Sequence, residues 1–515
     1  MISPATGRWL ALIAAYLGWL FDGFEMGIFG VVGRSALRSL LPDGQQGDVD
    51  LWFGIITAMF LIGAAAGGVL FGWLGDRIGR VRAMALSVLT YAVLTGGCGL
   101  AQSPLQLALL RFFAALGMGG EWALGVALVM EVWNHGAASR LPGVSVRAWL
   151  AGIIGSASNL GFALVALLNI GLTTVLADLR SVLEALRVPE WLVETLLANN
   201  GWRLLMLLGI TPAILTFLIR LFVPESEKWT QEKAAGRTNH WATRDLLGVL
   251  LGTASAVAIA FLWMKHLQVP RTWQIIGTAV GLLITGIAYL YPVHSYLQRV
   301  GVAREQKAFL IKRMLLAAVL SGVALIGTWA SIQWGVMWVS SASLNPLITS
   351  PSGQKALTFP TAVGWTQFWS AFGSVFGCIL AAWTGDWIGR RPAYFLICVL
   401  ALASTLGFYQ LNTEYNNTFL VWAFLCGFFA ASFYGWIPLY FPELFPTAVR
   451  AIGQGFGFNF GRILAAIGAL QTGVLITEVF QGSVPKAASV MACVFIVGMI
   501  VIWFAPETKG KGLPD

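Results

Sequence analysis

The sequence has little charge. Aspartate, glutamate, lysine and arginine make up 11% of its 515 residues, whereas 57% are hydrophobic. A soluble domain usually carries about 25% charged residues, and a single soluble core stops growing near roughly 250–300 residues. The shortage of charge therefore excludes one large soluble core and predicts an integral membrane protein surrounded by the lipid bilayer. The net charge of +9 is spread over short segments between apolar runs, so no nucleic-acid partner is expected.

Cysteine and histidine are scarce too, with five cysteines and four histidines. The cysteines all lie in apolar stretches, without a CxxC pair or a histidine at ligand spacing: Cys98, Cys378, Cys398, Cys426 and Cys493. Neither a metal site nor disulfides are expected. There is also no nucleophile–base constellation, so we expect neither an enzyme nor a cofactor. The first apolar run contains acids and lacks a small-residue cleavage site, which predicts a transmembrane helix and not a signal peptide.

Long apolar segments are what the chain has in abundance. A bilayer core of about 30 Å needs roughly 20 apolar residues per helix. Segments near that length form two sets of six, at 9–32, 52–74, 83–101, 105–132, 149–175 and 203–222, and at 314–340, 360–383, 393–411, 418–439, 452–478 and 487–505. Two more uncharged segments, about 246–263 and 273–291, lie between the sets. The predicted fold is an all-α integral membrane protein with 14 transmembrane helices.

Two nearly identical hexapeptides indicate that the two sets are homologous halves. Residues 75–80 are GDRIGR and residues 385–390 are GDWIGR, each between two apolar runs. From the aspartate to the acid after the fourth span is 55 residues in one half (76 to 131) and 57 in the other (386 to 443). Such halves can rock about a shared central site. We predict an N-terminal six-helix bundle over 1–224, a cytoplasmic linker with the two additional helices over 225–313, a C-terminal six-helix bundle over 314–508 and a cytoplasmic tail over 509–515.

Lysine and arginine set the predicted orientation. With a cytoplasmic N-terminus, 20 of them fall on the cytoplasmic side and eight outside, the bias that membrane insertion favours. We therefore expect a multi-pass protein of the cell (inner) membrane with both termini in the cytoplasm. The hexapeptides then lie on the cytoplasmic side, where ion pairs can hold the inside closed and break as the halves rock; the alternative is a purely structural tight turn. The predicted cytoplasmic gate consists of Asp76, Arg80, Glu131, Arg140, Asp386, Arg390, Glu443 and Arg450.

The hexapeptides and their flanks resemble a motif of the major facilitator superfamily. Gly72-x-x-Gly75-Asp76-Arg77-x-Gly79-Arg80 resembles the family's loop motif between helices 2 and 3, and the second copy resembles its counterpart between helices 8 and 9. The segment that begins at Arg111 resembles the fourth-helix motif, and Pro224-Glu225-Ser226 and Pro506-Glu507-Thr508 resemble the bundle ends of sugar-porter-like members. The resemblance covers nearly the whole chain and implies transport of a small molecule by alternating access.

A narrower resemblance bears on the substrate. Leu17–Glu25, Gly201-Trp202-Arg203 and the two extra central helices resemble sialate:proton symporters and neighbouring organic-acid symporters. Asp-Gly-Phe-Glu at 22–25 also resembles aromatic-acid symporters, while the loop 445–450 and Arg462 resemble the organic-ion and niacin-type branch. The resemblance implies proton-coupled symport of a small organic acid, sialic acid or another carboxylate. Alternatives are a sugar or aromatic-acid symporter, an uncoupled facilitator or exporter, and a non-transporting sensor.

Ionisable residues inside the predicted spans indicate a proton-coupling site, because each is costly without a partner or a function. Asp22 and Glu25 are three residues apart on one helical face, so they can titrate as a coupled pair. Arg111 lies roughly 9 Å below the outer surface at 1.5 Å per residue, about as deep as Glu25. We expect Arg111 to pair with Glu25 or Asp22, as the Asp–Arg pair of proton-coupled sugar porters implies; a static salt bridge is the alternative. Glu121 lies deeper, as a second proton site, a substrate contact or a structural acid.

Arg462 is the expected anchor for an organic anion, because it lies inside an apolar span and a guanidinium binds a carboxylate bidentately. The alternative is a gate or a bridge to a neighbouring helix. Aromatic faces with amides suit sugars or aromatic acids. The other expected substrate-binding residues are Gln333, Gln367, Asn459, Asn159, Tyr434 and Trp334. The expected partners are thus a small-molecule substrate and protons, bound by a monomer.

Overall fold

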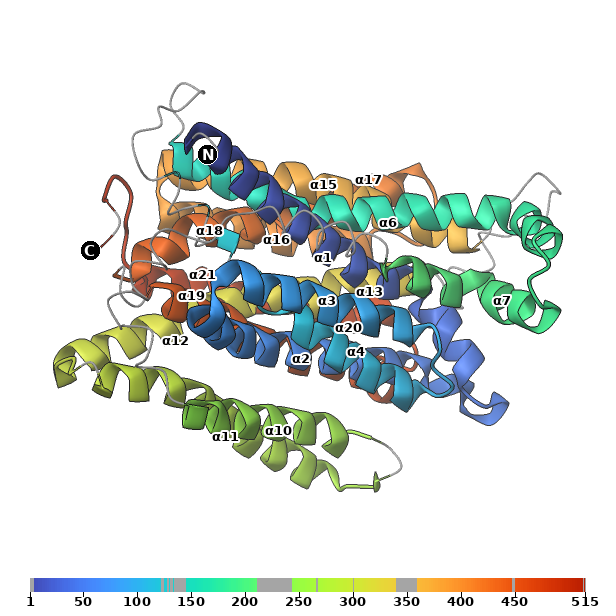
Figure 1. The fold of residues 1–515 in the computed structure, drawn as a ribbon, viewed down its shortest axis with the longest axis horizontal. Coiled ribbons are helices and arrows are strands. Elements are labelled where there is room, and N and C mark those ends of the chain that lie inside the picture. The colour runs from blue at the N-terminus through green and yellow to red at the C-terminus, as the bar shows by residue number, and fades with distance from the viewer. Residues whose placement is uncertain are drawn as a thin grey trace.

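The computed structural model describes residues 4–121, 125–126, 129, 133, 145–210, 243–264, 267–299, 301–339, 359–446, 450–512 and 514. These residues fold into helices, most of which run roughly along the long axis of the molecule (Figure 1).

The N-terminal half contains α1 (Pro4–Leu40), α2 (Val49–Ile78), α3 (Arg80–Cys98), α4 (Pro104–Met118), α6 (Val146–Ala185) and α7 (Glu190–Leu208). Next come α10 (Leu246–Leu262) and α11 (Arg271–Arg299). The C-terminal half contains α12 (Arg304–Ile326), η5 (Gly327–Ile332), α13 (Gln333–Val339), α15 (Phe359–Ile388), α16 (Arg390–Gln410), α17 (Asn417–Ala430), α18 (Phe433–Leu444), α19 (Arg450–Val474), η7 (Leu475–Val479), α20 (Val484–Ala492) and α21 (Val494–Val501).

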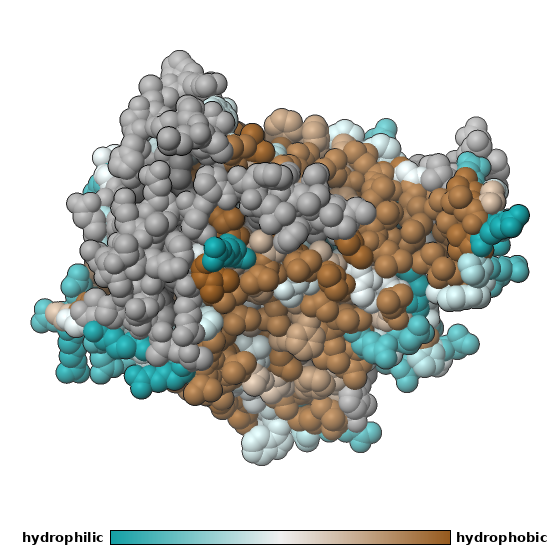
Figure 2. All heavy atoms as spheres, viewed as in Figure 1, coloured by the Kyte–Doolittle hydropathy of each residue, from teal (hydrophilic) through white to brown (hydrophobic). Residues whose placement is uncertain are grey.

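Eleven described helical segments are long and apolar enough to cross a membrane, and each coincides with one predicted span. Two more predicted spans, 105–132 and 246–263, contain the shorter apolar helices Pro104–Met118 and Leu246–Leu262. The predicted span 203–222 lies mostly outside the described residues, so the total of fourteen stays a prediction. On the face shown in Figure 2, hydrophobic residues cover the middle of the molecule and hydrophilic residues gather toward the ends of its long axis. That distribution suits a protein whose middle lies in a bilayer.

Both hexapeptides form the junction between two helices, and each turn is a single residue. Only Gly79 separates α2 from α3, and only Gly389 separates α15 from α16. Their φ angles are 110° and 109°, a region that glycine enters without the steric cost of a Cβ. The same backbone geometry at equivalent positions of the two halves agrees with the predicted duplication.

Two helices are longer than the apolar segments that predict them. α6 continues to Ala185, although its predicted span ends at 175, and α11 continues to Arg299, although its predicted span ends at 291. Hydropathy marks the part of a helix that lies in the bilayer, whereas a helix can continue into water where polar side chains support it. An ion pair between Arg180 and Glu184, four residues apart with 3.9 Å between nitrogen and oxygen, stabilises the extension of α6.

The two halves meet along two seams, where α2 packs along α19 and α6 packs along α15. Small residues let the backbones approach closely. A Cβ added to Gly54 would lie 2.9 Å from the carbonyl oxygen of Ala469, and one added to Gly155 would lie 2.3 Å from that of Tyr434. Larger side chains at these glycines would push the halves apart.

The additional helices α10 and α11 form a hairpin beside the two bundles (Figure 1). Nε1 of Trp263 donates a hydrogen bond to Oγ1 of Thr278 at 3.0 Å, which fastens one helix to the other. Both helices contact α19, and α10 also contacts α2. An ion pair joins Arg271 at the start of α11 to Glu478 in η7. The hairpin therefore rests on the seam between the halves.

Candidate functional site

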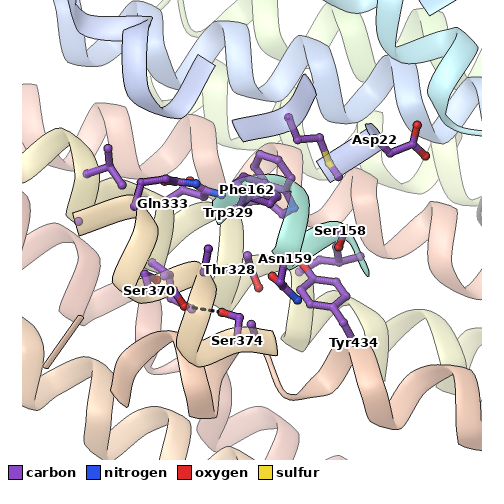
Figure 3. A pocket seen from close by; sticks show the side chains of 18 of the residues that line it. Asp22, Ser158, Asn159, Phe162, Thr328, Trp329, Gln333, Ser370, Ser374 and Tyr434 are labelled. Atoms are coloured by element: carbon purple, nitrogen blue, oxygen red, sulfur yellow. Dashed lines mark hydrogen bonds between the residues drawn. The ribbon is translucent and has the colours of Figure 1, made fainter. Parts of the chain in front are cut away.

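A cavity lies between the two halves, and polar side chains from both halves line it (Figure 3). Helices α1, α2, α4 and α6 contribute from the N-terminal half, and α12, η5, α13 and α15 to α19 contribute from the C-terminal half. The polar residues that line it are Asp22, Ser158, Asn159, Thr328, Gln333, Thr366, Gln367, Ser370, Ser374, Tyr434 and Arg462. The cavity can therefore offer a cation, an acid, amides and hydroxyls to one bound molecule.

Five of the seven predicted substrate-binding residues line this cavity: Arg462, Gln333, Gln367, Asn159 and Tyr434. Figure 3 shows Asn159 and Tyr434 close together and Gln333 at the opposite side of the drawn cluster. Nδ2 of Asn159 donates to the carbonyl oxygen of Gly155 and to Sγ of Cys378, both at 3.3 Å. These bonds hold the amide at the wall between α6 and α15.

Two predicted substrate contacts need correction, because Trp334 and Asn459 do not line the cavity. The Trp334 ring is fully buried and packs edge-on against Phe53 of α2, with 5.1 Å between ring centroids. Asn459 is buried at the α19–α2 seam, and its Oδ1 accepts a hydrogen bond from Nη1 of Arg462 at 3.1 Å. Neighbouring residues of a helix point in different directions, so the position of Gln333 in the cavity turns Trp334 away from it.

Aromatic rings form much of the apolar wall. The π-helical turn η5 brings Thr328 and Trp329 to the cavity, and Trp19, Phe60 and Phe162 line it from the N-terminal half. Single π-helical turns are rare and occur often at functional sites, because the extra residue redirects side chains. Flat rings beside amides suit a small molecule with both apolar and polar groups.

Arg462 is the cation of the cavity, and it is 8% exposed. Its Nη1 donates to the carbonyl oxygens of Ala64 at 3.2 Å and Gly119 at 3.4 Å, both in the opposite half. Its guanidinium also stacks over the Phe458 ring, 4.8 Å from the centroid. The carbonyls and the ring face that orient the guanidinium carry no charge of their own.

Glu25 and Arg111 form the predicted ion pair between α1 and α4. Nη1 of Arg111 lies 2.6 Å from Oε1 of Glu25, and Thr95 donates to the same oxygen at 3.0 Å. The two side chains are 1% and 2% exposed, and neither lines the cavity. The Arg111 guanidinium lies over the rings of Phe29 and Phe60, 5.2 and 4.5 Å from their centroids. The pair is therefore enclosed by protein and separated from the cavity by the Phe60 ring.

The other two predicted proton-coupling acids differ in access. Asp22 lines the cavity, and Figure 3 shows it at the edge of the drawn group, apart from the other labelled polar side chains. Glu121 is 1% exposed and does not line the cavity. Of the predicted acids, Asp22 is thus the one that a bound molecule or a cavity water can reach.

Arg390 and Glu443 form the predicted ion pair beside the second hexapeptide. Nη2 of Arg390 lies 2.6 Å from Oε1 of Glu443, and its Nε donates to Oε2 at 2.9 Å. Arg390 also donates to the carbonyl oxygen of Gly385 at 3.1 Å and lies 3.4 Å from Asp386. Both partners of the bidentate pair are at most 3% exposed, so two of the predicted gate residues form a buried ion pair.

Two contacts that the sequence did not predict join this cluster to the N-terminal half. Nη1 of Arg147 lies 3.4 Å from Oε1 of Glu443, and the backbone N–H of Ser145 donates to Asp386 at 2.8 Å. Ser145 and Arg147 stand at the start of α6, whereas Asp386 and Glu443 belong to the other half. Polar bonds therefore cross between the halves at the hexapeptide end of the molecule.

Glu507, in the closing motif of the second half, caps α16. Its carboxylate accepts hydrogen bonds from the backbone N–H groups of Arg390 and Arg391, each at 3.0 Å, and of Thr508 and Lys509 at 2.9 and 3.0 Å. Burial raises the pKa of Glu507, but these donors outweigh it and hold the pKa below its usual value. The N-terminal end of the α16 dipole favours the same charged form. The closing motif thus fastens the chain's end to the charged turn.

Glu131 and Arg140 lie outside the described residues, and the side chains of Asp76, Arg80 and Arg450 are not among those that the structure describes. Their pairing stays a prediction.

Comparison with known proteins gives relatives along the whole chain. Residues 10–260 match the family model described as Sugar (and other) transporter. A cis,cis-muconate transport protein of Acinetobacter baylyi is 25% identical over 97% of this chain and 95% of its own. A niacin transporter of the same organism is 23% identical over 96% of this chain and 93% of its own. A sialic acid transporter of Escherichia coli is 27% identical over 43% of this chain and 45% of its own.

Among solved structures, the proton:xylose symporter XylE is similar over 99% of this chain and 98% of its own, with a TM-score of 0.62 and 17% identity. At that identity the likeness shows the fold. An all-helical membrane protein with two homologous halves around a central polar cavity has the architecture of a secondary transporter. With this fold and these relatives, the chain resembles transporters of the major facilitator superfamily, and the relatives named above are transporters and not enzymes.

Proposed function

We propose that this transporter takes up a small organic acid together with protons, by alternating access. One observation carries the proposal: Arg462 of the C-terminal half and Asp22 of the N-terminal half line the same buried cavity. A cation for the substrate and an acid for the proton are the two groups that a proton-coupled importer of anions needs.

The substrate class follows from the groups around Arg462. A guanidinium binds a carboxylate with two parallel charge-assisted hydrogen bonds. The amides of Gln333, Gln367 and Asn159 can bond to hydroxyl or carbonyl groups of the same molecule, and the Trp329 ring can cover its apolar part. Muconate, niacin and sialic acid, for which the relatives are named, are all carboxylic acids, which supports this class. Sialic acid is the leading named substrate, with aromatic acids and sugars as alternatives.

In this proposal Asp22 receives the proton from the cavity. The titratable and charged groups of the described residues that line the cavity with it are Arg462 of α19, Tyr434 of α18 and Cys426 of α17. The Glu25–Arg111 pair then acts as a static bridge between α1 and α4, because protein encloses it on every described side. Glu121 acts as a buried structural acid.

The ion pairs at the hexapeptide end would form the cytoplasmic gate. Arg147 and Ser145 of one half bond to Glu443 and Asp386 of the other, so separating the halves at this end breaks charge-assisted bonds. In the proposed cycle they break each time the cavity opens to the cytoplasm. The proposed setting is the inner membrane, with a monomer whose two termini lie in the cytoplasm.

Uptake by the purified chain in proteoliposomes tests the proposal. The panel contains N-acetylneuraminate (a sialic acid), cis,cis-muconate, nicotinate, benzoate and D-xylose, each with and without an inward proton gradient. We expect at least one acid to accumulate, and to accumulate faster with the gradient. Arg462→Ala should raise the KM for that acid about tenfold or more, the loss of roughly 1.4 kcal/mol or more of binding. Arg180→Ala, which removes an exposed cation far from the cavity, is the matched control.

Each part of the proposal can fail separately. Uptake of D-xylose without uptake of any acid would overturn the substrate class. Uptake of an acid that ignores the proton gradient would identify a facilitator. An unchanged KM in Arg462→Ala would remove Arg462 from the binding site.

A further inference from the structure

Ala64 and Gly119, which accept hydrogen bonds from Arg462, form a recess in the opposite half together with Gly68. Asn459 lies against this recess, one helical turn before Arg462 on α19. A Cβ added to Gly68 would lie 2.2 Å from Nδ2 and 2.4 Å from Oδ1 of Asn459. A Cβ added to Gly119 would lie 1.9 Å from the carbonyl oxygen of Ala64. The absence of a side chain at Gly68 lets α19 bring Asn459 against α2, and its absence at Gly119 lets the end of α4 pack against the backbone of α2.

The recess holds one edge of the Arg462 guanidinium. Nη1 donates to the carbonyl oxygens of Ala64 and Gly119, and to Oδ1 of Asn459 at 3.1 Å. Within the described residues, Nη2 and Nε of Arg462 make no hydrogen bond. Because the side chain also lines the cavity, the guanidinium has one edge bound to the N-terminal half and donors left for a ligand.

We propose that the N-terminal half completes the carboxylate site: the recess orients Arg462 toward the cavity, and Gly68 and Asn459 are positioning residues for the bound anion. This inference rests on the proposed function, in which Arg462 anchors an organic acid. An arginine already held by three acceptors loses little side-chain freedom when an anion binds. The acceptors are uncharged, so they do not compete with a carboxylate for the positive charge.

The recess also connects anion binding to the movement of the halves. Ala64 and Gly119 belong to the N-terminal half and Arg462 to the C-terminal half. When the halves separate along the α2–α19 seam, two of the three acceptors leave the guanidinium. The arginine is then free to take other rotamers, and its affinity for the acid falls. Release of the substrate thus follows from separation at this level of the seam.

The test measures the affinity of the full-length chain, in lipid nanodiscs, for cis,cis-muconate, nicotinate and N-acetylneuraminate. Gly68→Ala adds a Cβ at Asn459, and Asn459→Ala removes the Oδ1 acceptor without adding atoms. Each should weaken binding of the acid about tenfold, the effect of roughly one hydrogen bond to a charged group. Gly455→Ala is the matched control, because it lies on α19 and no atom lies within 4 Å of the added Cβ.

A double variant separates positioning from general damage to the fold. If Gly68 acts through Asn459 and Arg462, then Gly68→Ala/Asn459→Ala should bind the acid no more than about twofold more weakly than Asn459→Ala alone. Additive losses would mean that Gly68 acts elsewhere, and they would overturn the inference. If Gly68→Ala does not fold, Asn459→Ala decides alone.

The remaining outcomes distinguish this inference from the proposed function. If Arg462→Ala weakens binding while Gly68→Ala and Asn459→Ala stay within about twofold of the native chain, the inference is overturned and the proposed function stands. If Arg462→Ala also leaves the affinity unchanged, or no acid of the set binds the native chain, the proposed function fails and this inference fails with it.

Discussion

Replacing Glu25 by glutamine leaves Arg111 charged in a place that protein encloses. The two side chains are 1% and 2% exposed, with 2.6 Å between their nitrogen and oxygen atoms. Removing one partner of a buried ion pair costs about 3–5 kcal/mol, because the other partner stays charged and loses its compensation. We expect Glu25→Gln to lower the free energy of unfolding by about that amount. Against a total stability of roughly 5–15 kcal/mol, this loss is large.

A double variant shows whether the loss comes from the unpaired charge. Glu25→Gln/Arg111→Met removes both charges and leaves a side chain of similar length between the rings of Phe29 and Phe60. Replacing a whole buried pair by apolar groups is often nearly neutral, so the double variant should cost no more than about 1 kcal/mol. It should therefore be more stable than Glu25→Gln alone, which is strong non-additivity.

The assay is reversible unfolding in mixed micelles with a rising fraction of denaturing detergent, followed by tryptophan fluorescence. Glu184→Gln, which breaks the exposed pair with Arg180, is the control and should cost at most about 0.5 kcal/mol. If Glu25→Gln costs less than about 1 kcal/mol, water reaches the pair. The same conclusion follows if the cost of the double variant equals the sum of the costs of Glu25→Gln and Arg111→Met. Either result would refute the static-bridge argument.

The other predictions concern the proton, the gate and the cap. Asp22→Asn should remove the dependence of uptake on the proton gradient, whereas the folded fraction of Glu25→Gln should keep that dependence. Uptake into proteoliposomes at two proton gradients measures both variants. The opposite pattern would mean that Glu25, and not Asp22, binds the transported proton. Glu443→Gln breaks the ion pairs to Arg390 and Arg147, so the cavity should open more often at the hexapeptide end. A cysteine introduced in the cavity should then react several-fold faster with a thiol reagent added on that side. An unchanged rate would exclude a gate there. The pKa of Glu507 is lowered in the folded chain, so its stabilisation is present above its unfolded pKa of about 4.3 and is lost as the pH falls through the folded value. Glu507→Gln should therefore flatten the fall of the melting temperature below about pH 4.3, and an equally steep fall would exclude this carboxylate as a cause.

The sequence predicts the spans and one ion pair well, for the same reason. A helix rises by a constant amount per residue, so counting residues from a loop gives the depth of a side chain. Counting matched the depths of Glu25 and Arg111, and the structure confirms their pairing. It also placed Asp386, Arg390 and Glu443 at one end of the molecule, where Arg390 contacts both acids.

The sequence does not indicate in the same way how each helix is rotated about its axis or how the two halves dock. Depth does not distinguish Gln333, which lines the cavity, from its neighbour Trp334, which packs on Phe53. The bond between Arg147 and Glu443 joins positions 296 residues apart, and no spacing rule relates them. The partners of Arg462 in the other half are backbone carbonyls, which every residue has. Only Gly68, which makes room for Asn459 of α19, could have marked the place, and glycine is frequent in this chain, at 59 residues.

The seam between the halves is held by different chemistry at different depths. At the hexapeptide end, charged groups bond across it, as Arg147 does to Glu443. At the opposite end of α2, backbones meet directly, since a Cβ on Gly54 would lie 2.9 Å from the Ala469 carbonyl oxygen. Opening at the hexapeptide end must therefore break ion pairs, whereas the contact of Gly54 with Ala469, described at the other end, is neutral and closely packed. Arg462 lies between the two ends and bonds to the opposite half, so either movement changes the group that would hold the acid. An acid bound at Arg462 can therefore favour one opening of the transporter over the other.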